Sequence, residues 1–170
     1  DSGRVHNRPP LTPCQQRAFD ELYAALDGGG RFLLHGVTGS GKTEVYMRII
    51  EELLSRGRTA ILLVPEISLT PQMAEQFTAR FGDLCALLHS RLSAGERFDE
   101  WRRIRRGEAR VVIGARSAVF APVENLGAII IDEEHESSYL ADNYPSYDAR
   151  EIAQERCAIN RALLLLGSAT

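Results

Sequence analysis

Short runs of apolar residues alternate with segments of helical period along most of this chain. Six runs have the length of β-strands and cover residues 31–35, 60–64, 84–89, 111–115, 128–132 and 162–167. Each run is too continuously apolar to have one face in water. Buried strands separated by helices predict an α/β fold, with a mainly parallel sheet flanked by helices.

Three of the intervening segments begin with residues typical of a helix N-terminus. Thr12 and Thr70 each precede a proline, which places a capping hydroxyl before a residue favoured in the first helical turn. Ser93, with Glu96 three residues later, forms the pattern of a capping box. Glycines follow the first two segments and predict where those helices end.

The composition is that of one ordinary globular domain. The 170 residues are 44% hydrophobic and 25% charged, and this length supports a single core. The net charge of -3 argues against capture of nucleic acid by bulk electrostatics, so such a role must rest on particular residues. We expect residues 1–10 to be a linker remnant and 11–170 to be one domain, a fragment of a larger protein because the chain stops just after an apolar strand.

The cysteines and the hydropathy pattern indicate a compartment. Cys14, Cys85 and Cys157 stand far apart without a C-x-x-C pair, which indicates neither a disulfide framework nor a cysteine zinc site. No apolar run approaches the ~20 residues that span a bilayer, and the polar N-terminal segment is not a secretory signal. We therefore expect a cytoplasmic protein with no membrane partner.

A phosphate-binding loop follows the first apolar run. Residues 36–43 read G-V-T-G-S-G-K-T, and a helical segment comes next. In such a loop backbone N–H groups surround nucleotide phosphates, Lys42 meets the outer phosphate charge and the Thr43 hydroxyl ligates Mg²⁺. The alternative, a glycine-rich turn before a lysine, leaves the strand before it and the helix after it unexplained. The candidate ATP-binding residues are Gly36, Thr38, Gly39, Ser40, Gly41, Lys42 and Thr43.

Acidic residues follow the run 128–132, at the sheet edge where open parallel sheets bind ligands. Asp132 is suited to holding Mg²⁺, and Glu133 to orienting or deprotonating an attacking water. His135 completes the sequence D-E-E-H. The alternative is a solvated acidic turn, in which His135 is only a polar turn residue.

Together with S-A-T at 168–170, these two motifs resemble motifs I, II and III of superfamily 2 helicases of the D-E-x-H type. The intervening strings are similar to those of one branch, the replication-restart helicases. They are V-P-E-I-S-L-T-P-Q at 64–72, L-H-S at 88–90, G-A-R-S-A-V-F-A-P at 114–122 and D-E-E-H-E-S-S-Y at 132–139. The resemblance implies that residues from 11 onward form the first RecA-like lobe, a three-layer P-loop NTPase domain.

The same resemblance implies a DNA-dependent ATPase that unwinds DNA 3′ to 5′ at stalled or repaired forks and initiates primosome assembly. The implied cofactors are ATP and Mg²⁺, and the implied partners are forked or single-stranded DNA, single-stranded-DNA-binding protein and primosome proteins in a bacterial cytoplasm. Such helicases also have an N-terminal DNA-binding region, a second lobe with an arginine finger and a zinc region, so zinc is expected only in those missing parts. We expect the fragment alone to bind nucleotide weakly, with almost no turnover.

The resemblance also implies roles for single residues. Lys42, Asp132 and Glu133 are the catalytic candidates, with Thr43 and Asp132 holding Mg²⁺. Gln15 falls on the glutamine that reads adenine, and Ser168 and Thr170 fall on the motif that couples hydrolysis to DNA. Thr12 with Gln15 is also a capping-box pattern, so an adenine contact and a cap both remain open for Gln15.

Further candidates for DNA binding or coupling surround the sheet edge. Aromatic faces stack on unpaired bases, so the tyrosines after the acidic motif predict a DNA-sensing loop; the alternative is packing of this loop onto its own domain. Arg116 and Ser117 follow a strand, where their guanidinium and hydroxyl groups are suited to binding a DNA phosphate. The alternative is a salt bridge of Arg116 within the domain. Relatives often carry basic residues where this chain has Leu140 and Ser146, which reduces the phosphate contacts expected from the loop. The candidates are Thr70, Arg116, Ser117, His135, Tyr139, Tyr144 and Tyr147.

Two other functions remain alternatives. One is another superfamily 2 DNA translocase, acting in fork reversal or repair. The other is an ATP-gated scaffold that binds forks without unwinding them. A P-loop GTPase is disfavoured because the sequence contains no N-K-x-D tetrapeptide for reading guanine.

Overall fold

The predicted runs form one six-stranded parallel sheet in a computed structural model that describes residues 8–35, 41–141 and 146–168. The strand order is β1-β8-β5-β2-β4-β3. The strands are β1 (Gly30–Leu34), β2 (Thr59–Leu63), β3 (Cys85–Leu88), β4 (Val111–Gly114), β5 (Leu126–Ile131) and β8 (Leu163–Gly167). A two-stranded antiparallel pair, β6 (Leu140–Ala141) with β7 (Tyr147–Asp148), lies beside the main sheet.

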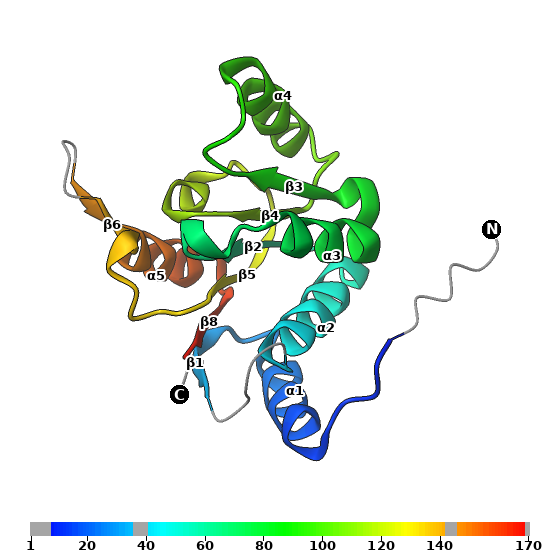
Figure 1. The fold of residues 1–170 in the computed structure, drawn as a ribbon. Coiled ribbons are helices and arrows are strands. Elements are labelled where there is room, and N and C mark those ends of the chain that lie inside the picture. Colours follow the sequence, from blue (N-terminus) through cyan, green and yellow to red (C-terminus); the bar gives the residue numbers. More distant parts are fainter. Residues whose placement is uncertain (1–7, 36–40, 142–145, 169–170) are drawn as a thin grey trace.

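Helices cover both faces of the sheet. They are α1 (Pro13–Ala25), α2 (Gly41–Ser55), α3 (Pro71–Phe81), α4 (Ala94–Arg105) and α5 (Ala149–Asn160). Figure 1 shows α1, α2 and α3 grouped apart from α5, which lies across the sheet from them. Two apolar cores result: Ala60 and Leu62 of β2 face α1, α2 and α3, and Ile61 and Leu63 face the side of α5. The predicted mainly parallel sheet between helices is thus confirmed.

The predicted helix starts are also observed. Thr12 and Thr70 cap α1 and α3, each accepting a backbone N–H on its hydroxyl, and the capping box of Ser93 with Glu96 opens α4. Gly82 ends α3 with a φ of 58°, in the left-handed region where a side chain would be strained.

One strand begins earlier than its pattern predicts. The sequence places its start at residue 128, whereas β5 begins at Leu126, which pairs with Thr59 before a register shift. The shift lets Thr59 join the ladder while Ala60 to Leu63 pair in a constant register with Ala128 to Ile131. No helix in the described parts of the chain is both long enough and apolar enough to cross a membrane.

Candidate nucleotide site

Three parallel strands bring the ends of distant motifs to one edge of the sheet. The ladder continues one residue beyond the strands, because Asp132 donates its N–H to the carbonyl of Leu63 at 2.9 Å and Ser168 donates to that of Leu34 at 3.0 Å. Glu134 donates to the carbonyl of Gly167 at 3.0 Å. Ser168 is therefore fixed next to β1, the strand that leads into the phosphate-binding loop, and the acidic motif is fixed beside the end of β8.

Lys42 joins these motifs through its ammonium group. It lies in the first turn of α2 and is only 5% exposed. Its Nζ atom lies 3.2 Å from Oε1 of Glu133, 3.5 Å from Oδ1 of Asp132 and 2.9 Å from the carbonyl oxygen of Ser168. The structure thus brings together the lysine that the sequence analysis assigns to the outer phosphate and the carboxylates that it assigns to Mg²⁺ and to the attacking water.

These residues fit a magnesium nucleotide. The ammonium group of Lys42 lies against the carboxylates of Asp132 and Glu133, so the negative charge there suits a cation. In nucleotide sites Mg²⁺ takes few protein ligands besides phosphates and water, so a small set of side chains is enough. Thr43 lies in the first turn of α2, where helix N–H groups favour anions. Glu133 has a φ of 51°, a strained conformation of the kind found at functional sites.

Several predicted site residues lie outside the described part of the chain. They are Gly36, Thr38, Gly39, Ser40, Tyr144 and Thr170. Their assignments remain predictions.

Gln15 uses both ends of its amide within the protein. Its Oε1 accepts from the N–H of Thr12 at 2.8 Å, which completes the capping box, and its Nε2 donates to the carbonyl of Gly41 at 3.0 Å. The capping interpretation is confirmed. The second contact joins α1 to Gly41, the residue before Lys42. Gln15 therefore lies next to the phosphate-binding loop, and its adenine-reading role remains a prediction.

Tyr46 is a site residue that the sequence analysis missed. Its hydroxyl donates to Oδ1 of Asp132 at 2.7 Å, and the side chain is 1% exposed. Burial and the neighbouring charge of Asp132 both raise the pKa of Tyr46, so the hydroxyl keeps its proton. Its place four residues after Lys42, on the same helix face, was the available sequence signal.

The segment after the acidic motif is held by backbone contacts. Tyr139 is fully buried, and its hydroxyl donates to the carbonyls of Leu63 and Asp132. Its ring therefore has no face open to a base. This agrees with the alternative in which the segment packs onto its own domain. Arg116 donates from Nη1 to the carbonyls of Ser138 and Leu140, both at 3.3 Å.

A polar cavity of about 430 Å³ opens beside this segment, at the carboxyl ends of β2, β3 and β4. Arg116, Ser117 and Tyr147, all DNA candidates, line it together with Glu66, His89 and Arg97 among others. His135 lies outside it with its side chain 62% exposed, and its Nε2 is 3.9 Å from Oε2 of Glu133. Thr70 is exposed and uses its hydroxyl as the cap of α3.

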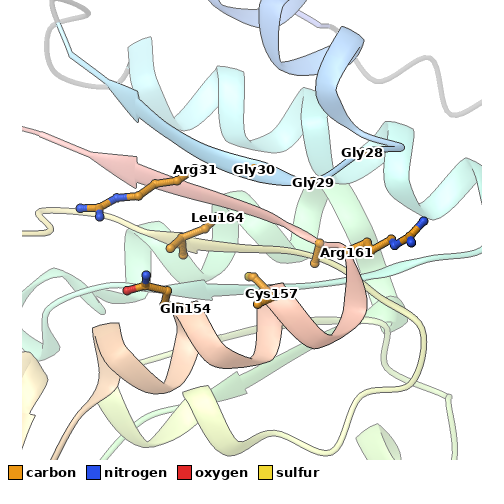
Figure 2. A pocket seen from close by; sticks show the side chains of 10 residues that line it. Gly28, Gly29, Gly30, Arg31, Gln154, Cys157, Arg161 and Leu164 are labelled. Carbon is orange, nitrogen blue, oxygen red and sulfur yellow. The ribbon is translucent and has the colours of Figure 1, made fainter.

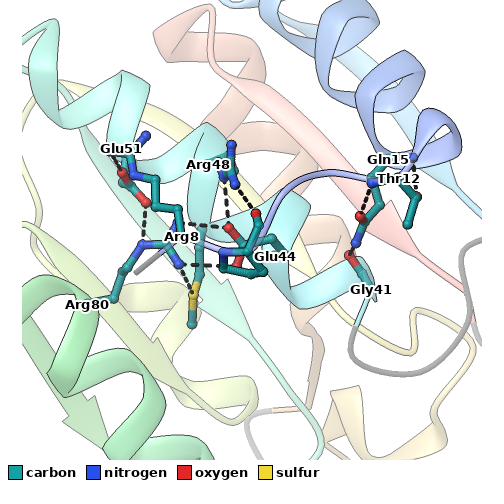
Figure 3. A network of polar contacts seen from close by, with 10 residues as sticks. Arg8, Thr12, Gln15, Gly41, Glu44, Arg48, Glu51 and Arg80 are labelled. Carbon is teal, nitrogen blue, oxygen red and sulfur yellow. Dashed lines mark hydrogen bonds and ion pairs between the residues drawn. The ribbon is translucent and has the colours of Figure 1, made fainter. Parts of the chain in front are cut away.

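An ion network joins α2 to α3 behind the site (Figure 3). Arg80 of α3 contacts Glu44 through two hydrogen bonds, of 2.8 and 3.1 Å, and Glu51 through a third of 2.6 Å. Arg48 adds a fourth, to Glu44, at 2.8 Å. Burial raises the pKa of Glu44, but the hydrogen bonds and charges of Arg80 and Arg48 outweigh it, so the pKa is lowered from its ordinary value.

A second cavity, of about 240 Å³, lies at the other edge of the sheet (Figure 2). Gly28 to Arg31 border it at the start of β1, and Arg161 and Ala162 border it before β8. The candidate site lies at the opposite, carboxyl ends of the strands, where Ser168 follows β8 and Asp132 follows β5, so this cavity is not part of it.

Comparison with known proteins identifies the family of this chain. The family model of the DEAD/DEAH box helicase matches residues 12–170, and the chain belongs to this family. Helicase domains of known structure share its RecA-like fold. The Hef helicase domain of Pyrococcus furiosus matches with a TM-score of 0.64 and 22% identity, over 95% of this chain and 33% of that one. RecG bound to a three-way DNA junction matches with a TM-score of 0.67 and 27% identity, over 95% and 21%.

Replication restart proteins have a higher sequence identity to this chain than these two helicases have. The replication restart protein PriA of Bacillus subtilis is 57% identical over 163 residues, which cover 95% of this chain and 20% of the relative. PriA of Synechocystis is 50% identical, over 95% and 20%, and PriA of Treponema pallidum is 51% identical, over 92% and 24%. This chain therefore spans about a fifth of the length of these relatives.

Proposed function

We propose that this chain is the ATP-binding lobe of a 3′ to 5′ DNA helicase that restarts replication at stalled or repaired forks. The observation that carries the proposal is the position of Lys42 Nζ, within 3.5 Å of the acidic motif and 2.9 Å from the Ser168 carbonyl. One ammonium group thus contacts both of the motifs that would respond to a γ-phosphate. The similarity to the replication restart protein PriA supports a role of this activity in replication restart.

The reaction is in-line attack of water on the γ-phosphate of ATP. Lys42 leaves the carboxylates and balances the charge that develops on the transferred phosphoryl group, while Glu133 orients and deprotonates the water. Thr43 and Asp132 are the residues that would hold Mg²⁺, which when bound neutralises phosphate charge. Exchange of the contact between Lys42 and Ser168 for a phosphate contact gives the S-A-T motif a direct signal of nucleotide binding.

DNA is proposed to pass the sheet edge at the polar cavity, where Arg116 and Ser117 would contact backbone phosphates. A net charge of -3 means that such binding depends on these local groups rather than on the whole surface. Single-stranded-DNA-binding protein and primosome proteins are the proposed further partners.

The test is Glu133→Gln in the natural full-length protein. The change keeps the size of the side chain but removes its base, so we expect ATP hydrolysis and strand separation to fall at least about 100-fold. Binding of ATP and of forked DNA should stay within about twofold, because neither needs the base. Steady-state hydrolysis, an unwinding assay on a labelled fork and equilibrium binding measure these quantities.

Glu108→Gln, at an exposed position after α4, is the matched control and should behave as wild type. A wild-type protein that binds forks in an ATP-dependent way but separates no strands would instead identify the ATP-gated scaffold. One that moves along duplex DNA without unwinding would identify the translocase.

A further inference from the structure

Tyr46 connects the helix of the phosphate-binding loop to the acidic motif. It donates its hydroxyl proton to Oδ1 of Asp132 at 2.7 Å, from a side chain that is almost fully buried. Its ring belongs to the apolar core between the sheet and helices α1, α2 and α3. A buried hydroxyl donor that reaches a half-buried carboxylate is a strong contact, because the carboxylate is charged.

Tyr46 and Lys42 contact Asp132 from different side chains of α2. Both side chains approach the same oxygen of Asp132, Tyr46 at 2.7 Å and Lys42 at 3.5 Å. Under the proposed function Lys42 turns to the phosphates when nucleotide binds. Tyr46 is fixed by its packed ring and stays, so it holds the carboxylate in place during the exchange.

Gly167 leaves the space in which this contact forms. A Cβ atom at position 167 would lie 1.8 Å from the Tyr46 hydroxyl oxygen and 2.8 Å from Oδ1 of Asp132. Real side chains do not approach so closely, so any larger residue would displace the tyrosine or the carboxylate. Three segments distant in the sequence thus meet at one hydrogen bond: α2, the acidic motif and the end of β8.

We propose that Tyr46 is a positioning residue that orients the Asp132 carboxylate for Mg²⁺, and that Gly167 makes room for it. The inference rests on the proposed function and adds a residue to its site. Groups that hydrogen-bond to a metal ligand fix its orientation, and their loss typically costs about 10- to 100-fold in metal affinity.

The test is Tyr46→Phe in the natural full-length protein, because this change removes the hydroxyl and keeps the packed ring. The readout is equilibrium binding of a fluorescent, non-hydrolysable ATP analogue, once with Mg²⁺ and once with excess EDTA. We expect affinity to fall about tenfold with Mg²⁺ and to be unchanged in EDTA. Tyr23→Phe, at a half-exposed position on α1, is the matched control and should match wild type in both conditions.

Each other outcome is decisive. Equal losses with Mg²⁺ and with EDTA would show a structural role only and overturn the inference, as would wild-type affinity in both. If the wild-type protein bound the analogue no better with Mg²⁺ than with EDTA, the proposed function itself would be overturned.

Gly167→Ala tests the same contact from the other side. Its added methyl group should displace the hydroxyl, so we expect the same loss that depends on Mg²⁺. The double variant with Tyr46→Phe should then be no worse than either single variant, because both remove one contact. Losses that multiply in the double variant would overturn the role of Gly167.

Discussion

Burial distinguishes the tyrosines that follow the acidic motif, although the sequence gives them one predicted role. Tyr139 is fully buried with its hydroxyl between two carbonyl groups, whereas Tyr147 is half-buried, lines the polar cavity and packs edge-on against Phe120 at 5.1 Å. Of the two that the structure describes, Tyr147 is the one placed where an unpaired base could approach it. Tyr139 contacts the candidate site through the backbone carbonyl of Asp132.

Tyr139→Phe should lower the free energy of unfolding by about 1–3 kcal/mol, because the carbonyls of Leu63 and Asp132 lose a buried donor. Urea denaturation of the variant and wild type measures the difference. Tyr147→Phe is the comparison and should change stability by less than about 0.5 kcal/mol. Unchanged stability of Tyr139→Phe with lost affinity for single-stranded DNA would restore the stacking hypothesis.

The sequence indicates the principal site residues but not what surrounds them. The meeting of Lys42 with Asp132 follows from the rule that parallel strands present their carboxyl ends at one edge. The hydrogen bond from Tyr46 was not predicted because it depends on how closely α2 packs onto the sheet. No local pattern encodes that distance, although the four-residue spacing from Lys42 limits the candidates.

At the scale of elements, α2 and α3 are joined by charges as well as by apolar packing. Arg80 and Glu44 are both about 11% exposed, so their pair is largely withdrawn from water. Since α2 begins at the phosphate-binding loop and α3 begins just after Thr70, this pair fixes the two elements relative to each other.

Glu44→Gln should lower the free energy of unfolding by about 1–3 kcal/mol at pH 7, because Arg80 loses one of its two carboxylate partners and keeps Glu51. The pKa of Glu44 is lowered in the folded protein, so its contribution is complete above the ordinary carboxyl pKa of 4.5 and is lost as pH falls through the lowered folded value. The difference between variant and wild type should therefore shrink in acid. Denaturant unfolding at pH 7 and at lower pH measures it.

Glu75→Gln, at an exposed position on α3, serves as the control and should give a small difference that does not depend on pH. A constant difference between Glu44→Gln and wild type at every pH would refute the electrostatic explanation.

The strands and capped helices could be predicted within one or two residues, because apolar runs and capping residues act locally. Helix α5 was not predicted. Only a few of its residues are buried, among them Ala149, Ala153 and Cys157, so its apolar stripe is narrow. Asp148 caps it through a hydrogen bond to the N–H of Arg150, and this was the available signal.

At the scale of the whole molecule, the chain matches about a fifth of the length of its relatives. Under the proposed function, this part holds the groups that bind and polarise ATP. In other P-loop NTPases, such as GTPases, an arginine finger stabilises the transition state and raises turnover about 10³- to 10⁵-fold. We therefore expect the 170-residue chain to bind ATP weakly and to hydrolyse almost none, even with forked DNA. Steady-state hydrolysis by this chain and by the natural full-length protein provides the comparison, and rapid DNA-stimulated hydrolysis by the chain alone would contradict the expectation.

The strand order also determines when the site can come into being during synthesis. In the described structure β1 pairs with β8, and the paired residues Gly30 and Leu163 are 133 positions apart (163 - 30). At a translation rate of about 5–20 residues per second, the first strand waits roughly ten seconds for its neighbour to leave the ribosome. Lys42 is thus made early, and its contacts with Glu133 and Ser168, on which the proposed function depends, form only after most of this chain has been synthesised.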